Sequence, residues 1–173
     1  GGGAIYSDAG EAVGDFADVL GIPVSETQAG KGILPWNHKW NVGPIGANGG
    51  IAANRLAKDA DLVIAVGTRL ADFTTSSKSA FQNPDVRFIG INVAGMDAYK
   101  MGALSLVGDA QATLKALLKE VGARQASPAY GQEISALKTE WDELVDQQRA
   151  RGTGGPNTQA QVIGIVNESA NAE

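Results

Sequence analysis

Glycine and polar residues follow three apolar runs of this 173-residue chain, at the points where the runs end. These residues are Gly67, Thr68, Arg69, Asn92 and Asp109. In an open parallel sheet the carboxyl ends of the strands meet at one edge, where backbone N–H groups and helix N-termini can receive phosphates. We therefore expect the five residues to line one crevice, which would suit a nucleotide. The alternative is a structural crevice in which Asp109 only caps the helix that follows it.

A long loop, predicted for residues 27–45, carries two further candidates for binding. Lys31 lies between two glycines and could meet a phosphate, although the same tripeptide could simply turn the chain. His38 is the only histidine, so it could face a substrate or cofactor, or lie at the surface or a subunit contact. Its immediate neighbours offer no further metal ligand, so we predict no metal site and assign no catalytic residue. Trp36 and Trp40 in the same loop predict an interface, because large aromatic side chains favour burial.

Composition excludes several classes of partner. The net charge is −5, and no cluster of Lys and Arg is present, which argues against binding to a nucleic-acid backbone. The chain has no cysteine and therefore no disulfide and no thiolate ligand or nucleophile. No apolar run approaches the roughly 20 residues that span a bilayer. We expect a soluble, cytoplasmic protein that binds neither nucleic acid nor membrane.

Apolar runs and helical spacing alternate along the chain. Short or continuous apolar runs, which are typical of buried parallel strands, occur at residues 22–26, 61–67, 86–93 and 104–107. Helical spacing is predicted after the candidate caps Ser7 and Asp8 as far as a C-cap at Gly21, and again over residues 46–60, 109–121, 130–149 and from 158. This alternation predicts an α/β fold with a mainly parallel sheet.

Both ends of the chain predict a fragment. Gly1 to Gly3 is a glycine-rich turn of the kind that follows a strand, so we expect the first strand of the sheet to be missing. The helix predicted from residue 158 has no later element to pack against, which indicates that a further domain begins there.

The order and spacing of many short segments resemble the central, Rossmann-like domain of thiamine-diphosphate enzymes of the acetolactate-synthase type. The segments include Gly1-Gly-Gly, Gly30-Lys-Gly32, Ala60-Asp61-Leu62, Gly67-Thr-Arg69 and Val107-Gly-Asp-Ala110. The resemblance implies a parallel sheet with helices on both faces over residues 1–122, a linker with a helix over 123–157, and the start of a pyrophosphate-binding domain over 158–173. Within the family, Glu26-Thr-Gln-Ala-Gly-Lys-Gly32 and Arg69-Leu-Ala-Asp-Phe-Thr-Thr75 look most like hydrolases that open a cyclic diketone in inositol breakdown.

The resemblance also places the chemistry outside this chain. Family members activate thiamine diphosphate with a glutamate of an N-terminal domain, and they hold the diphosphate through Mg²⁺ at a Gly-Asp-Gly and Asn motif of a C-terminal domain. Gly108-Asp109-Ala110 matches only half of that motif. The resemblance therefore implies a largely structural domain without catalytic residues, whose partners are the other domains of the enzyme and, in a dimer or tetramer, further copies of it.

A nucleotide-binding module is the alternative that the resemblance leaves open. In relatives that bind FAD or ADP, the loops at the strand ends hold the nucleotide. Here the run from Arg69 to Phe73 lacks the second arginine of the flavin pattern, and Asn92 stands where those relatives often carry an acid. FAD or ADP is therefore the secondary expectation.

Overall fold

Five strands form two parallel sheets in the part of the chain that the structure, a computed structural model, describes, which is residues 1–150 and 154–170. The strands are β1 (Val24–Glu26), β2 (Asn41–Pro44), β3 (Leu62–Val66), β4 (Arg87–Asn92) and β5 (Leu104–Val107). β1 pairs with β2, and β3, β4 and β5 pair in that order. Every pair is parallel, which confirms the predicted sheet type. Among the described residues, no strand joins β1 to β3.

The three-stranded sheet brings the carboxyl ends of its strands to one edge. Ile64 of β3 lies opposite Ile89 of β4, and Ile89 lies opposite Leu104 of β5. In this parallel register the three strands also end side by side, with Val66 opposite Ile91 and Asn92 opposite Val107. The polar residues that follow β3, β4 and β5 are therefore neighbours in space.

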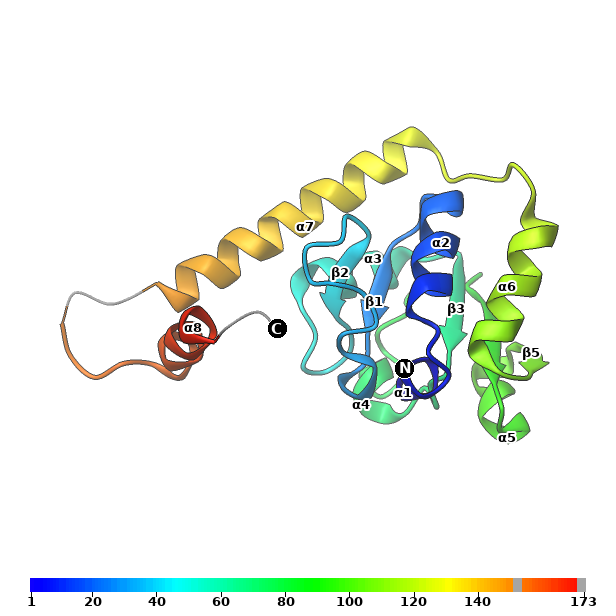
Figure 1. The fold of residues 1–173 in the computed structure, drawn as a ribbon, viewed down its shortest axis with the longest axis horizontal. Helices are drawn as coiled ribbons and strands as arrows, with labels where there is room; N and C mark the ends of the chain where they lie inside the picture. Colours follow the sequence, from blue (N-terminus) through cyan, green and yellow to red (C-terminus); the bar gives the residue numbers. More distant parts are fainter. Residues whose placement is uncertain (151–153, 171–173) are drawn as a thin grey trace.

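Helices cover both faces of the sheets, as predicted (Figure 1). They are α1 (Gly2–Tyr6), α2 (Gly10–Leu20), α3 (Ile51–Asp59), α4 (Asp72–Thr75), α5 (Gly95–Ala98), α6 (Ala110–Val121), α7 (Pro128–Arg149) and α8 (Gln159–Ser169), with 3₁₀ turns at Gln28–Gly30 and Lys100–Gly102. On one face, Phe16 of α2 and Leu114 of α6 pack with Ile91 of β4. A second core joins α3, β2 and α7 through Leu56, Val42 and Ile134.

The start of the chain differs from the sequence prediction. Ser7 and Asp8 do not cap α2, because residues 2–6 form a short helix and Asp8 then turns with a φ of 51°. The N-cap of α2 is instead Ala9, without a side-chain hydrogen bond. At the other end of the helix, Gly21 is the C-cap as predicted, with a φ of 65° and its N–H donating to the carbonyl oxygen of Ala17.

The predicted loop at residues 27–45 contains a strand that the sequence did not indicate. β2 has only four residues, and Gly43 and Pro44 among them are poor strand formers. It forms through its pairing with β1 and its packing under α3 and α7. The predicted helix at 46–60 begins later, at Ile51, because residues 46–49 form a turn closed by the Gly49 N–H and the Gly46 carbonyl.

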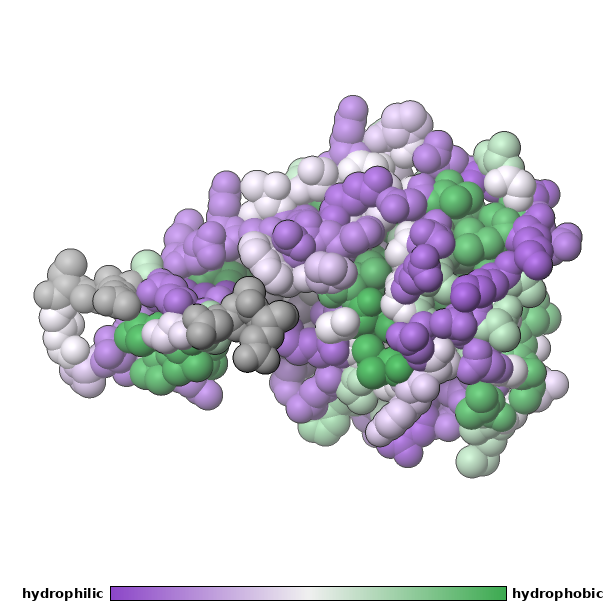
Figure 2. Space-filling model, in the orientation of Figure 1, coloured by the Kyte–Doolittle hydropathy of each residue, from purple (hydrophilic) through white to green (hydrophobic). Residues whose placement is uncertain are grey.

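In Figure 1 α7 runs across the top of the molecule toward the left, and α8 lies below the left end of α7. α7 begins at Pro128, just after its N-cap Ser127, and buries Ile134 completely against the second core. α8 packs on α7, where Gly164 meets Arg149, so it does have a neighbour within the chain. Apolar residues of α8 remain at the surface in Figure 2, among them Val162, Ile163 and Val166. None of the helices in the described ranges combines the length and the apolar character that a membrane span requires.

Candidate functional site

The crevice at the carboxyl ends of β3, β4 and β5 is formed mainly by backbone and amide groups that bind one another. The Nδ2 of Asn92 donates to the carbonyl oxygen of Thr68 at 3.2 Å, and its Oδ1 accepts from the N–H of Ala94 at 3.0 Å. The Gly108 N–H donates to the carbonyl oxygen of Asn92 at 3.1 Å. The structure therefore brings Thr68, Asn92 and Gly108 together, and the side chain of Asn92 donates one hydrogen bond and accepts one within the protein.

Gly67 makes the turn out of β3 in close contact with the first residues of the chain. Its φ is 58°, and its carbonyl oxygen accepts from the Gly3 N–H at 2.8 Å. A Cβ atom on Gly67 would lie 2.7 Å from the Gly3 Cα, which is closer than real side chains approach. Glycine is thus required here by packing as well as by conformation.

The amino group of Gly1 lies inside the protein at the same edge. It donates to the carbonyl oxygen of Val66 at 2.7 Å. Burial lowers the pKa of this amino group from 8.0 to about 6, and the negative charge of Glu26 only partly opposes that shift. Glu26 is itself buried, and its carboxylate accepts from the Gly32 N–H at 2.9 Å. Sequence reasoning did not single out Glu26, although a carboxylate that ends an apolar strand is a signal of a buried polar contact.

Asp109 and Arg69 differ in whether their side chains bind other groups of the protein. The Oδ1 of Asp109 accepts from the Ala112 N–H at 2.9 Å and caps α6, as the structural alternative predicted. Arg69 is exposed and takes part in none of the hydrogen bonds or ion pairs found among the described residues. Its charge is therefore available at the surface.

The loop after β3 contains backbone that sequence reasoning did not predict. Leu70, Ser76, Ser77 and Lys78 all have positive φ values, an uncommon conformation for residues other than glycine. Thr75 stabilises this loop, since its buried hydroxyl donates to Ala71 and accepts from the Lys78 N–H. The Phe73 carbonyl accepts from the Ala47 N–H, while its ring stays exposed.

Lys31 and His38 lie in different places. Lys31 is exposed and follows Gly30, whose Cα faces Gly1 at the crevice edge. His38 lies toward the other end of β1, where the Trp40 carbonyl accepts from Val24 and the Nδ1 of His38 accepts from the Trp40 N–H at 3.3 Å. The structure thus brings Lys31 near the crevice and leaves His38 away from it.

Trp36 and Trp40 behave differently within the same loop. Trp36 is 77% exposed, and its role at an interface stays a prediction. Trp40 packs against the second core, and its Nε1 donates to Asp18 at 2.8 Å. The hydrogen bonds from Lys39 and from Trp40 hold the pKa of Asp18 below its usual value.

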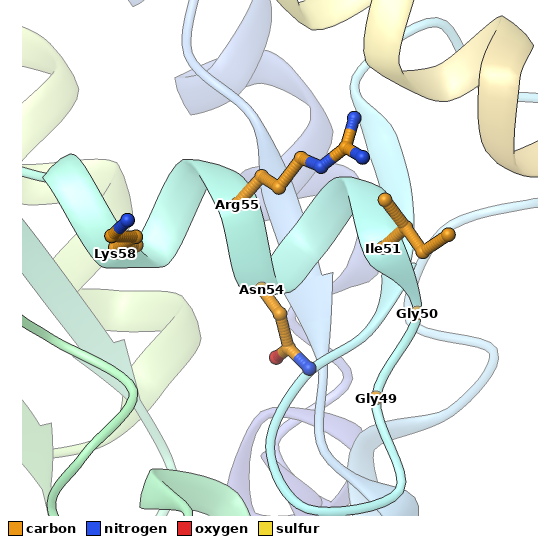
Figure 3. A pocket seen from close by; sticks show the side chains of 6 residues that line it. All are labelled: Gly49, Gly50, Ile51, Asn54, Arg55 and Lys58. Carbon is orange, nitrogen blue, oxygen red and sulfur yellow. The ribbon is translucent and has the colours of Figure 1, made fainter.

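A shallow pocket of about 330 Å³ at the start of α3 offers a second place for a ligand (Figure 3). In Figure 3 Asn54 points toward the preceding loop, where it accepts from the N–H of Gly46 and donates to its carbonyl oxygen. Arg55 points toward α7, where it forms an ion pair with Glu140 at 2.6 Å. Asn54 and Arg55 are therefore engaged within the protein, and we assign the pocket no ligand.

The described ranges contain no ready-made set of side chains for a metal ion. No group of three or more His, Cys, Asp or Glu side chains is placed there to hold a metal ion. The described residues therefore show no cluster of ligands that fits a cation holding a diphosphate.

A family comparison decides which fold family these features belong to. Residues 1–117 match the model described as "Thiamine pyrophosphate enzyme, central domain". The chain belongs to the thiamine pyrophosphate enzyme family. The match covers the central domain from α1 into α6, which includes the whole crevice and both sheets.

Curated relatives of this central domain share one name. The chain is 50% identical over 192 aligned positions to 3D-(3,5/4)-trihydroxycyclohexane-1,2-dione hydrolase of Clostridium perfringens, with 98% of the chain and 30% of the relative covered. It is 45% identical over 155 positions to hydrolase 2 of that name from Bacillus cereus, covering 89% of the chain and 24% of the relative. For the Clostridium tetani hydrolase the identity is 46% over 147 positions, with 85% and 23% covered. The chain thus spans less than a third of the length of these relatives.

Proposed function

We propose that this chain is the central domain of a thiamine-diphosphate-dependent hydrolase that opens the ring of 3D-(3,5/4)-trihydroxycyclohexane-1,2-dione to 5-deoxy-glucuronate in myo-inositol breakdown. The observation that carries the proposal is the 50% identity over 98% of the chain to a hydrolase of that name. Thiamine diphosphate and Mg²⁺ would bind on other domains, because the family resemblance places the activating glutamate and the Gly-Asp-Gly and Asn motif there.

The role of these residues is then architectural. The glycine contact between Gly3 and Gly67, the amide of Asn92 and the cap at Asp109 each fix one loop at the sheet edge. Such a framework positions neighbouring domains without taking part in the reaction. The exposed Trp36 and Phe73 and the apolar side of α8 are surfaces that those domains or further copies in a dimer or tetramer would cover.

The proposed division of the chain follows the same line. Residues 1–122 would form the central domain, a proposal that the family match over residues 1–117 supports. Residues 123–157 form a linker with α7, and residues 158–173 begin the pyrophosphate-binding domain. Positions 151–153 and 171–173 lie outside the described residues. The proposed location of the full protein is the cytoplasm.

The direct test uses the full-length protein with the dione as substrate. We expect consumption of the dione and formation of 5-deoxy-glucuronate only when thiamine diphosphate and Mg²⁺ are present. Pyruvate serves as the control substrate for acetolactate chemistry. Turnover of pyruvate without turnover of the dione would overturn the assignment.

A second experiment tests whether the chain binds cofactor. Calorimetric titration of the 173-residue chain with thiamine diphosphate and Mg²⁺ should show no binding, whereas the full-length protein should bind both. Titration with ADP and with FAD tests the nucleotide alternative, which the free charge of Arg69 beside the Gly67 turn favours. Micromolar ADP binding that is lost in Arg69→Ala would make the crevice a nucleotide site.

A further inference from the structure

Strand β5 forms an open edge of the three-stranded sheet. β4 pairs with one side of β5, and no strand in the described ranges pairs with the other side. In Figure 1 β5 lies at the right-hand end of the molecule, on the opposite side from α8. Its sequence, Leu-Ser-Leu-Val, contains no charged residue and no proline, which are the residues that commonly protect an exposed edge from pairing. The edge of β5 is therefore able to accept a further strand.

The outer strand of the other sheet is protected, in contrast to β5. β2 contains Gly43 and Pro44, and α7 packs against it. A Cβ atom on Gly43 would lie 3.3 Å from the indole nitrogen of Trp141, so this helix covers β2 closely. Of these two outer strands, β5 is the one that the described residues leave uncovered.

The outward backbone groups of β5 belong to Ser105 and Val107. The Gly108 N–H donates to the Asn92 carbonyl, so Gly108 and, two residues before it, Leu106 direct their backbone groups toward β4. Because these groups alternate in direction along a strand, Ser105 and Val107 direct theirs away from β4. None of the turn, loop and cap hydrogen bonds found among the described residues uses the backbone of Ser105 or Val107. Their N–H and C=O groups are thus available to another strand.

Apolar side chains surround the same edge. Leu104 and Val107, at the two ends of β5, are 66% and 59% exposed. α5 lies beside them, since a Cβ atom on its first residue, Gly95, would lie 3.8 Å from the Val107 side chain. The α5 region adds the exposed side chains of Val93, Met96 and Tyr99. Figure 2 shows apolar surface over this part of the molecule, and a patch of this kind marks an interaction surface.

The charges around β5 favour an antiparallel second copy as the partner. Lys100 precedes the strand, and Asp109 follows it. When a strand pairs antiparallel with its own copy, the amino end of each strand lies beside the carboxyl end of the other. Lys100 of each copy would then approach Asp109 of the other copy, whereas a parallel arrangement would bring like charges together. Asp97 is the only other charged residue between positions 93 and 109, and it already pairs with Lys100 at 3.4 Å.

We propose that β5 pairs antiparallel with β5 of a second copy of the full-length protein, about a two-fold axis at Leu106. In this register Ser105 of each copy lies opposite Val107 of the other, and the two residues exchange backbone hydrogen bonds. The same axis places the α5 segments of the two copies side by side, so that their apolar side chains enlarge an interface that strand pairing alone would leave small. The two three-stranded sheets become one continuous sheet. The inference rests on the edge of β5 and not on the hydrolase assignment.

The molecular mass of the full-length protein tests whether β5 joins two copies. Val107→Lys should weaken the association about tenfold or more, because the new charge would be buried against the other copy. In sedimentation over a dilution series, the mass of this variant should be half that of the unchanged protein at concentrations where the unchanged protein stays associated. Val19→Lys is the matched control, because it makes the same substitution at an exposed position of α2, and it should leave the mass unchanged.

A cysteine at Leu106 tests the register of the two strands. The described chain has no cysteine, and in the proposed register Leu106 lies opposite its own copy at a Cα–Cα distance of about 4.5 Å. A disulfide can span that distance. Mild oxidation of the full-length Leu106→Cys variant should therefore give a covalent dimer on a denaturing gel. The unchanged protein and Val19→Cys, oxidised in the same way, should remain single chains.

Four results would overturn the proposal. A full-length protein that is monomeric at every concentration would exclude the second copy. An unchanged mass in Val107→Lys would assign the β5 edge to solvent or to another segment of the same chain. An equal loss of mass in Val19→Lys would attribute the effect to the added charge. A loss of mass in Val107→Lys without a crosslink at Leu106→Cys would exclude the antiparallel register. Turnover of the dione enters none of these readouts, so their failure is distinguishable from failure of the hydrolase assay.

Discussion

The side-chain amide of Asn92 donates to the carbonyl oxygen of Thr68 across 3.2 Å and so ties the loop after β4 to the loop after β3. Its other end accepts from Ala94. One side chain thus fixes the edge of the sheet at which a nucleotide or a neighbouring domain would be met.

Replacing Asn92 should destabilise the protein in a graded way. Asn92→Ala removes both hydrogen bonds and should cost about 1 to 2 kcal/mol. Asn92→Asp should cost about 1 kcal/mol more, because a carboxylate oxygen would face the Thr68 carbonyl. Urea unfolding measures both, and Asn37→Asp, at an exposed position, is the control expected to change stability by less than about 0.5 kcal/mol. A stabilised or nucleotide-binding Asn92→Asp variant would contradict the structural role.

Adding a methyl group at Gly67 should be much more damaging than adding one at Gly102. Both glycines have positive φ, 58° and 68°. A Cβ at Gly67 would meet the backbone of Gly3, whereas nothing lies within 4 Å of one at Gly102. We expect Gly67→Ala to cost more than about 3 kcal/mol and Gly102→Ala about 1 kcal/mol, the conformational part alone. Equal losses in thermal unfolding would show that the contact with Gly3 does not form.

Asp109 should behave as a helix cap. Asp109→Ala should lower the free energy of unfolding by about 1 kcal/mol, and Asp109→Ser should restore most of the loss, since serine also accepts from the N–H at N3. Chemical unfolding of the three proteins gives the comparison. If the serine variant were as unstable as the alanine variant, the carboxylate would have a role beyond capping.

Truncating Ile134 should release α7 from the second core. The side chain is fully buried beside Val42 and Leu56, so Ile134→Ala should cost about 3 kcal/mol. The neighbouring Ser135 is exposed, and Ser135→Ala should have little effect. Hydrogen exchange along α7 would show whether the helix opens before the sheets do. Unchanged stability in Ile134→Ala would mean that α7 does not depend on this contact.

The buried amino group of Gly1 should make the chain less stable as the pH falls from 8 to 6. The pKa of this amino group is about 6 in the folded chain and 8.0 without burial. The unfolded chain therefore binds more protons between pH 6 and pH 8. Stability should be lower by about 2 kcal/mol at pH 6 than at pH 8 through this group alone. Acetylation of the amino group is the matched control, because it keeps every side chain and removes this titration. Identical pH profiles for the two forms in urea unfolding would contradict the burial of the amino group.

Local signals predicted much of this architecture. The apolar runs at β3 and β4 and the caps Gly21 and Asp109 are written in short stretches of sequence. The meeting of Gly67, Asn92 and Asp109 at one edge follows from parallel pairing. The hydrogen bond from Asn92 to Thr68 joins residues far apart in the sequence. The sequence therefore could not show that the side-chain amide of Asn92 binds the protein itself.

The remaining differences also arise from long-range packing. β2 forms in a segment with glycine and proline because β1 and α7 lie beside it. Lys31 and His38 are close in sequence, yet the intervening residues carry them to different ends of β1. No local pattern reports that separation.

Two of the three tryptophans lie in the loop between β1 and β2, and the third, Trp141, lies in α7 beside Gly50. Intrinsic fluorescence therefore reports on the half of the molecule built from β1, β2, α3 and α7, and it is largely silent about β3, β4 and β5. Circular dichroism sees both halves. If the fluorescence and circular dichroism curves have different unfolding midpoints, the two halves unfold separately, and no added label is needed to detect it.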